Sequence, residues 1–121
     1  MAKKILVVDD DDLVLIALEA LLSPSGYEVT TACNGDDALE KLNNKKFDLM
    51  ILDILMPGMN GFELCEKIRA LDEYKSVPII MLTAKSGSED KKKGMAMGAN
   101  LFLPKPIAPQ HLIDLIKKSL E

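Results

Sequence analysis

The 121-residue sequence lacks tryptophan and has only two tyrosines and three phenylalanines. Because 48% of the residues are hydrophobic, a core is expected, and it must rest on Leu, Ile, Val, Met and Ala. Excess positive charge is also lacking, since the net charge is −4. This balance speaks against nucleic acid or an anionic membrane surface as the main partner, because both attract basic proteins.

Cysteine and long hydrophobic runs are equally scarce. Cys33 and Cys65 form no CxxC motif and are interpreted as reduced residues of a cytoplasmic protein. The longest apolar stretch, Leu13–Leu22, is interrupted by Glu19 and falls short of the roughly 20 residues that span a bilayer. The early apolar run stops at acids after Val8, which does not fit a secretory signal. A single domain over residues 1–121 is predicted.

Short apolar runs alternate with amphipathic stretches along the whole chain. The predicted strands are Lys4–Val8, Tyr27–Ala32, Phe47–Leu52, Val77–Leu82 and Ala99–Leu103. The predicted helices are Asp12–Leu22, Gly35–Leu42, Gly61–Leu71, one within Gly87–Met97, and one from Pro109 to the end. Five β-α units of this kind predict an α/β fold, a parallel sheet with helices on both faces. The first helix is apolar almost all round and is expected to pack deep against the sheet and a neighbouring helix.

Two helix ends carry recognisable signals. Asn60 is suited to cap the helix that starts at Gly61, and Gly98 is suited to end the fourth helix in a left-handed conformation. Ala108 precedes Pro109 and offers no capping side chain, which could weaken the last helix by about 1 kcal/mol.

Polar residues follow four of the five predicted strands. Asp9-Asp10 follows the first, Asp53 the third, Thr83 the fourth and Pro104-Lys105 the fifth. The carboxyl ends of parallel strands share one edge of the sheet, where ligand sites form. We therefore expect three acids, a hydroxyl and an ammonium group to meet there.

These residue types fit phosphoryl transfer. Clustered carboxylates attract Mg²⁺, which keeps several waters and accepts phosphate oxygens. Asp53 would be the nucleophile and form an acyl phosphate, because a metal on the same oxygens removes much of the repulsion between two anions. Thr83 and Lys105 would bind the phosphoryl oxygens. An acid after a strand is often only a helix cap, and this is the preferred interpretation of Asp11 and Asp12.

Five motifs together resemble the receiver domain of bacterial two-component response regulators, over the whole chain. They are Val7-Val8-Asp9-Asp10, the segment from Leu52 to Gly61, Pro78-Ile79-Ile80-Met81-Leu82-Thr83-Ala84, Gly98-Ala99 and Lys105-Pro106. The resemblance implies a (βα)5, doubly wound, flavodoxin-like fold with strand order 2-1-3-4-5. It also implies that Asp53 accepts a phosphoryl group, that Thr83 and Lys105 bind it, and that the Lys105–Pro106 bond is cis.

The same resemblance implies a metal site and a switch. Asp10, Asp53 and the backbone carbonyl of Leu55 would bind Mg²⁺, with Mn²⁺ as a substitute, and Asp9 would act as the acidic neighbour, usually through water. Phe102 matches the switch aromatic, which is also a plausible core residue. Leu55 and Lys85 stand at positions that tune the lifetime of the phosphoryl group, and we expect both to shield it. The fourth helix, fifth strand and fifth helix would form the surface that changes.

The resemblance further implies partners. The donor would be a sensor histidine kinase or a His-containing phosphotransfer protein, and the domain would assist only its own phosphorylation and dephosphorylation. No helix-turn-helix follows Glu121, so output is expected through an unidentified partner protein or through a domain outside this chain. A monomer or a weak, phosphorylation-promoted dimer is expected. Lys91-Lys92-Lys93 and Lys117-Lys118 are either a solvated face or a contact for an acidic partner or second copy.

Three other classes share some of these features. A small phosphatase with an Asp nucleophile carries a second acid two residues later, where this chain has Leu55. A flavodoxin-type flavin protein needs a phosphate loop after the first strand, where Asp9 to Asp12 would repel it. A phosphorylation-independent binding module has no need for the acidic pair together with Asp53, Thr83 and Lys105.

Overall fold

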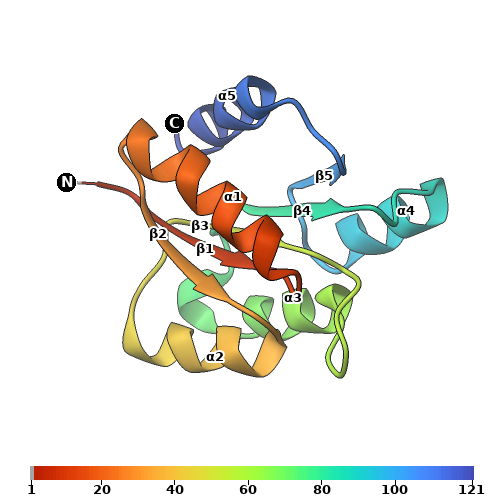
Figure 1. Cartoon of the computed structure of the whole chain (residues 1–121). Coiled ribbons are helices and arrows are strands. Elements are labelled where there is room, and N and C mark those ends of the chain that lie inside the picture. The colour runs from red at the N-terminus through yellow and green to blue at the C-terminus, as the bar shows by residue number, and fades with distance from the viewer. Residues whose placement is uncertain (1) are drawn as a thin grey trace.

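A single parallel sheet organises the chain, whose computed structural model describes residues 2–121 (Figure 1). Its five strands lie in the order β2-β1-β3-β4-β5, which confirms the predicted flavodoxin-like topology. Every neighbouring pair is parallel. The strands are β1 Lys4–Val8, β2 Glu28–Ala32, β3 Leu49–Leu52, β4 Ile79–Thr83 and β5 Leu101–Pro104.

Helices cover both faces of the sheet. Alternate residues of β1 enter different cores, because successive side chains of a strand point to opposite faces. Ile5 and Val7 join the core under α1 (Asp12–Leu22) and α5 (Pro109–Ser119), whereas Leu6 and Val8 join the core under α2 (Gly35–Asn44) and α3 (Gly61–Arg69). Figure 1 shows α1 and α5 on one side and α2 and α3 on the other. The helices are α1 Asp12–Leu22, α2 Gly35–Asn44, α3 Gly61–Arg69, α4 Ser88–Ala96 and α5 Pro109–Ser119, with short 3-10 turns at Ser23–Ser25 and Asp72–Tyr74.

Strand β1 begins where the apolar pattern predicts, and the other four strands begin one or two residues later. Phe47 illustrates the reason: it is buried, but its N–H donates to the hydroxyl of Tyr74 at 3.3 Å and not to a strand. Burial against a neighbouring loop thus extends the apolar run beyond the strand itself. Helix α2 runs two residues further than predicted, to Asn44, and α3 ends at Arg69.

Helix α1 packs against the sheet and the neighbouring helix α5, as expected, but it is not enclosed, so the expected depth of burial was wrong. Leu15, Leu18 and Leu22 are buried, but Leu13 is 76% exposed and Ile16 is 64% exposed. The physical reason is that α1 lies in an outer layer, where only one stripe of a helix can touch the sheet. No helix within residues 2–121 is both long enough and apolar enough to cross a membrane.

Helix termini are set by local hydrogen bonds. Asn60 caps α3 in a reciprocal capping box with Glu63, as its position predicts. Asp11 caps α1 by accepting from the Leu13 N–H at 3.0 Å. The acidic run after β1 therefore divides into the site pair Asp9 and Asp10 and a helix cap. Gly98 follows α4 with a φ of 110°, a conformation that glycine adopts without steric cost. Ala108 makes no side-chain cap for α5.

Candidate functional site

Three carboxylates meet where β1 and β3 end side by side. The backbone continues the ladder past each strand, because Asp9 N–H donates to Ala32 at 3.1 Å and Asp53 N–H donates to Val8 at 3.0 Å. Asp9 and Asp53 are buried, whereas Asp10 is exposed. One carboxylate oxygen from each lies within 4.8 Å of the others. Such a cluster of hard oxygen donors can hold a metal ion.

Lys105 brings a positive charge to this cluster from the far end of the chain. Its Nζ donates to Asp9 Oδ2 at 2.6 Å and to Asp53 Oδ2 at 3.1 Å. The Lys105–Pro106 peptide bond is cis, and the Lys105 N–H donates to the carbonyl of Thr83 at 3.0 Å. The strand pairing of β4 with β5 therefore carries Lys105 to the sheet edge that bears the acids.

Burial and hydrogen bonding shift the pKa values of Asp9 and Lys105. Burial raises the pKa of Asp9, and the hydrogen bonds from Lys105 and Asp11 only partly offset it. Burial alone would lower the pKa of Lys105, but its hydrogen bonds to Asp9 and Asp53 outweigh that effect and raise the pKa. Lys105 is therefore charged at neutral pH and offsets part of the repulsion among the acids.

The carboxylate of Asp53 has a defined orientation. Its Oδ1 accepts from the Ile54 N–H at 2.7 Å and, more weakly, from the Leu55 N–H at 3.4 Å. Its Oδ2 faces Lys105. Asp9 is oriented in a similar way, since its Oδ1 accepts from the Asp11 N–H at 2.9 Å. These backbone donors hold both carboxylates in place, so the two side chains need little rearrangement to bind a metal ion.

Thr83 ends β4 beside this cluster and is fully buried. Its Oγ1 accepts from the Lys85 N–H at 3.1 Å, so its own hydroxyl proton remains available for another acceptor. Phe102 lies in β5 with 9% of its surface exposed. It packs under α4 at Gly94, where an added Cβ would lie 2.9 Å from both the Phe102 ring and the sulfur of Met81.

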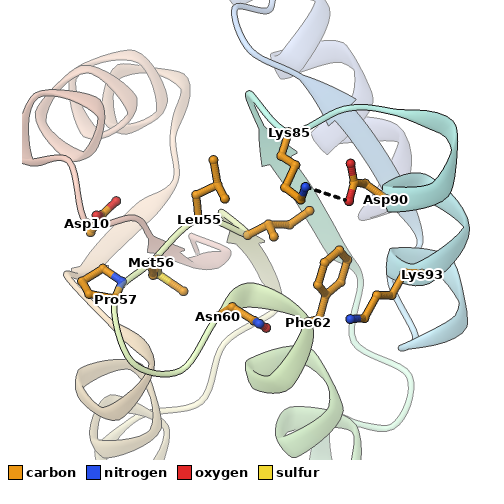
Figure 2. Close-up of a pocket in the computed structure, with 10 residues that line it drawn as sticks. Asp10, Leu55, Met56, Pro57, Asn60, Phe62, Lys85, Asp90 and Lys93 are labelled. Atoms are coloured by element: carbon orange, nitrogen blue, oxygen red, sulfur yellow. Dashed lines mark ion pairs between the residues drawn. The ribbon is translucent and has the colours of Figure 1, made fainter.

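An open pocket of about 500 Å³ lies next to the acids, between the β3–α3 loop and α4. Figure 2 shows the side chains of Asp10 and Leu55 on one side and Lys85 on the other, with Lys85 directed toward Asp90. Leu55 is 52% exposed although it is apolar. Phe62 forms part of the lining, with Lys93 Nζ 4.7 Å from its ring centre. Of the three clustered acids, Asp10 is the one that lines this pocket.

The structural roles of two residues were not identified from the sequence: Gly61 lies against the site, and Arg69 lies at the opposite edge of the sheet. An added Cβ at Gly61 would lie 2.8 Å from the carbonyl carbon of Asp53 and closer still to its oxygen. Arg69 donates to the carbonyl oxygens of Gly98, Tyr74 and Val77, and so ties the end of α3 to the turn before β5. The glycine was visible in the sequence, but only the loop path from Asp53 back to α3 reveals why its small size is needed.

Comparison with known proteins agrees with this arrangement. The response regulator receiver domain family matches residues 5–117. The alkaline phosphatase synthesis transcriptional regulatory protein PhoP of Bacillus subtilis is 40% identical over 120 residues, which are 99% of this chain and 49% of PhoP. The chemotaxis protein CheY4 of Vibrio cholerae superposes with a TM-score of 0.95 at 38% identity, covering 99% of this chain and 100% of CheY4. A CheY-like receiver domain protein of Methanospirillum hungatei gives a TM-score of 0.93 at 35% identity, covering 99% and 94%.

The fold and the acidic site thus define a phosphorylatable signalling switch of the two-component class. The chain belongs to the response regulator receiver domain family. It spans about half the length of curated relatives such as the probable transcriptional regulator ycf29 of Porphyra purpurea and PhoP.

Proposed function

We propose that residues 1–121 form one receiver domain in which Asp53 accepts a phosphoryl group from a phosphohistidine donor. The observation that carries this proposal is the contact of Lys105 with both Asp9 and Asp53 at the ends of three strands. A buried carboxylate with a cation on one oxygen and backbone donors on the other is oriented for attack. Structural acids on a protein surface have no need of such an arrangement.

The acidic cluster fits Mg²⁺ as the resident cation. Asp10, Asp53 and the backbone carbonyl of Leu55 would hold it, with Asp9 interacting through water and Mn²⁺ as a substitute. The donor set supports this choice, because all ligands are oxygens and the exposed side at Asp10 leaves room for water. Bound there, the ion lowers the repulsion between the carboxylate of Asp53 and the incoming phosphoryl group.

The transfer step follows from the positions of the side chains. A carboxylate oxygen of Asp53 attacks phosphorus, the P–N bond to the donor imidazole breaks, and the imidazole leaves with that electron pair. Lys105 then binds one phosphoryl oxygen as a compact cation, and the hydroxyl of Thr83 donates to another. The domain acts only on its own phosphoryl group, which it later loses to water.

The lifetime of the acyl phosphate depends on access of water through the open pocket. Leu55 and Lys85 line that pocket, so we expect them to shield the acyl phosphate and slow its hydrolysis. Replacing Lys85 with Ala should therefore speed dephosphorylation, measured by the decay of the labelled protein. A decay rate that is unchanged or slower would contradict this role.

Phosphorylation is proposed to act on the surface formed by α4, β5 and α5. It adds about −1.5 to −2 charges at Asp53 and draws in Thr83 and Lys105. Movement of Thr83 makes room for Phe102 to change position, which is a shift between two existing states. Amide NMR shifts over residues 87–120 should therefore respond to phosphorylation. If they stay unchanged, the switch does not use this route.

The proposed donor is a sensor histidine kinase or a His-containing phosphotransfer protein, and the proposed target is a protein or an attached output domain. The basic residues of α4 and α5 offer a contact for an acidic partner or for a second copy. Charge reversal at Lys91 or Lys92 would weaken that contact and its salt dependence. A cytoplasmic location belongs to the same proposal and is supported by the two unpaired cysteines, Cys33 and Cys65.

The decisive experiment is Mg²⁺-dependent labelling by a small phosphodonor, performed on the wild type and on Asp53→Asn. Labelling should need the metal ion and should vanish in the variant, which keeps the size and most hydrogen bonds of the side chain. Equal labelling of both proteins would refute Asp53 as the acceptor. Turnover of an added phosphoester would instead favour a phosphatase, for which a receiver should show no activity.

A further inference from the structure

Lys85 connects the proposed phosphoryl site to helix α4 through two separate contacts. Its backbone N–H donates to Thr83 Oγ1 at 3.1 Å, and its side-chain Nζ lies 3.5 Å from Asp90 Oδ1 (Figure 2). Asp90 belongs to the first turn of α4. One residue therefore touches both the site hydroxyl and the start of the helix.

The two ends of α4 are held very differently. At the C-terminal end, Arg69 donates two hydrogen bonds to Gly98, at 3.0 and 2.7 Å, and the Cys65 thiol contacts the carbonyl of Met97 at 3.4 Å. At the other end, Gly87 provides no side-chain cap, and Gly94 is the only buried residue of the helix. The first turn of α4 is consequently the end of the helix that the loss of a single contact can displace.

The position of the Lys85 ammonium group depends on the negative charges in and beside the open pocket. In the unmodified protein it pairs with Asp90, and both residues line the pocket together with Asp10. A phosphoryl group on Asp53 would place about two further negative charges beside this pocket and would engage the Thr83 hydroxyl. The Lys85–Asp90 ion pair then faces competition from the new charge, whereas the Thr83 hydroxyl can donate to the phosphoryl group and still accept from the Lys85 N–H.

We infer that Lys85 exchanges Asp90 for the phosphoryl group, and that loss of the Lys85–Asp90 ion pair releases the first turn of α4. This inference rests on the proposed phosphorylation of Asp53. It connects the proposed phosphoryl site to the first turn of α4 through the Lys85–Asp90 ion pair and the hydrogen bond from the Lys85 N–H to Thr83. Asp90 is the positioning residue in this scheme and takes no part in phosphoryl transfer.

The test uses beryllofluoride with Mg²⁺, because this anion binds a carboxylate as a tetrahedral analogue of the phosphoryl group. Amide NMR resonances of residues 88–96 are followed during titration of the full chain. In Asp90→Asn, Lys85 has lost its competing partner, so half-saturation should occur at about twofold to fivefold lower beryllofluoride, the range expected of an exposed ion pair. The unmodified variant should also show α4 resonances displaced toward their saturated positions.

Two controls separate the ion pair from a general effect of charge. Glu89→Gln removes the same charge from the same turn, but Glu89 forms no ion pair among residues 2–121, so this variant should titrate like the wild type. In a Lys85→Ala background, Asp90→Asn should have no further effect. If Asp90→Asn and Glu89→Gln shift equally, or if the Asp90 effect persists without Lys85, the ion-pair exchange is overturned.

The same titration distinguishes a failure of the proposed function of Asp53 from a failure of the Lys85–Asp90 exchange. Beryllofluoride must perturb the wild type and leave Asp53→Asn unchanged. If both proteins respond alike, or if neither responds, Asp53 is not the acceptor and the inference falls with it. If only the wild type responds while the Asp90 variant behaves like its Glu89 control, the acceptor stands and the connection through Lys85 is refuted.

Discussion

Gly61→Ala should distort the acidic site directly, because the added methyl group meets the backbone of Asp53. The new Cβ would lie 2.8 Å from the Asp53 carbonyl carbon and from Ile54 Cα, whereas ordinary contacts begin at 3.4 Å. These are backbone atoms, so no flexible side chain can turn aside. Because the Asp53 carbonyl oxygen lies closer still, either the loop after β3 or the start of α3 must shift by about an ångström.

The magnitude follows from two opposing terms. Overpacking of this kind costs about 1–3 kcal/mol, and the rigid partner favours the upper end of that range. Alanine recovers up to about 1 kcal/mol through its better helix propensity. We expect a net loss of about 2 kcal/mol in the free energy of unfolding, measured by urea denaturation. Displacement of the carboxylate should also slow phosphodonor labelling by about tenfold to a hundredfold.

Gly26→Ala is the matched control for destabilisation without distortion of the site. Gly26 has a φ of 97° and no atom within 4 Å of an added Cβ. Its substitution should cost about 1–2 kcal/mol through the left-handed backbone alone and should leave labelling unchanged. Labelling of Gly61→Ala at the wild-type rate would refute the reasoning, as would a Gly26→Ala variant that is slowed equally.

Three further predictions concern stability. Burial raises the pKa of the Cys65 thiol to about 11 from 9.0, so the contribution of the protonated thiol to folding is complete below pH 9 and is lost as pH rises toward 11. Between pH 8 and pH 10 the free energy of unfolding of the wild type should fall by about 1.4 kcal/mol more than that of Cys65→Ala. An equal pH dependence of the two proteins in urea denaturation would contradict this. Arg69→Ala should lower the free energy of unfolding by about 2–4 kcal/mol, because several carbonyls lose a charged donor, and Arg69→Lys should recover only part of that loss. A change under about 0.5 kcal/mol would show that water replaces the hydrogen bonds of Arg69. Leu22→Ala should cost about 2–5 kcal/mol and Leu13→Ser less than about 0.5 kcal/mol in thermal or urea unfolding, and equal losses would show that the exposed face of α1 is covered in solution.

The sequence by itself determined the architecture and the chemical groups of the site. Near-continuous apolar strands alternating with amphipathic helices allow few arrangements other than a parallel sheet, because β-α-β crossovers are right-handed and short. Acids placed after the first and third strands must then approach one another once those strands pair. The strand order itself came from resemblance, since periodicity says nothing about which strands are neighbours.

Only the tertiary structure decided which contacts are made. Helix α1 shows this most clearly: its composition suggested deep burial, but its position in an outer layer leaves Leu13 and Ile16 in solvent. The importance of Gly61 depends on a loop that returns against the backbone of Asp53, and the pair between Lys85 and Asp90 depends on the path from β4 into α4. The residues of these two contacts are near in sequence, but the paths of the loops that join them depend on how β3, α3, β4 and α4 pack, which local residue patterns do not encode.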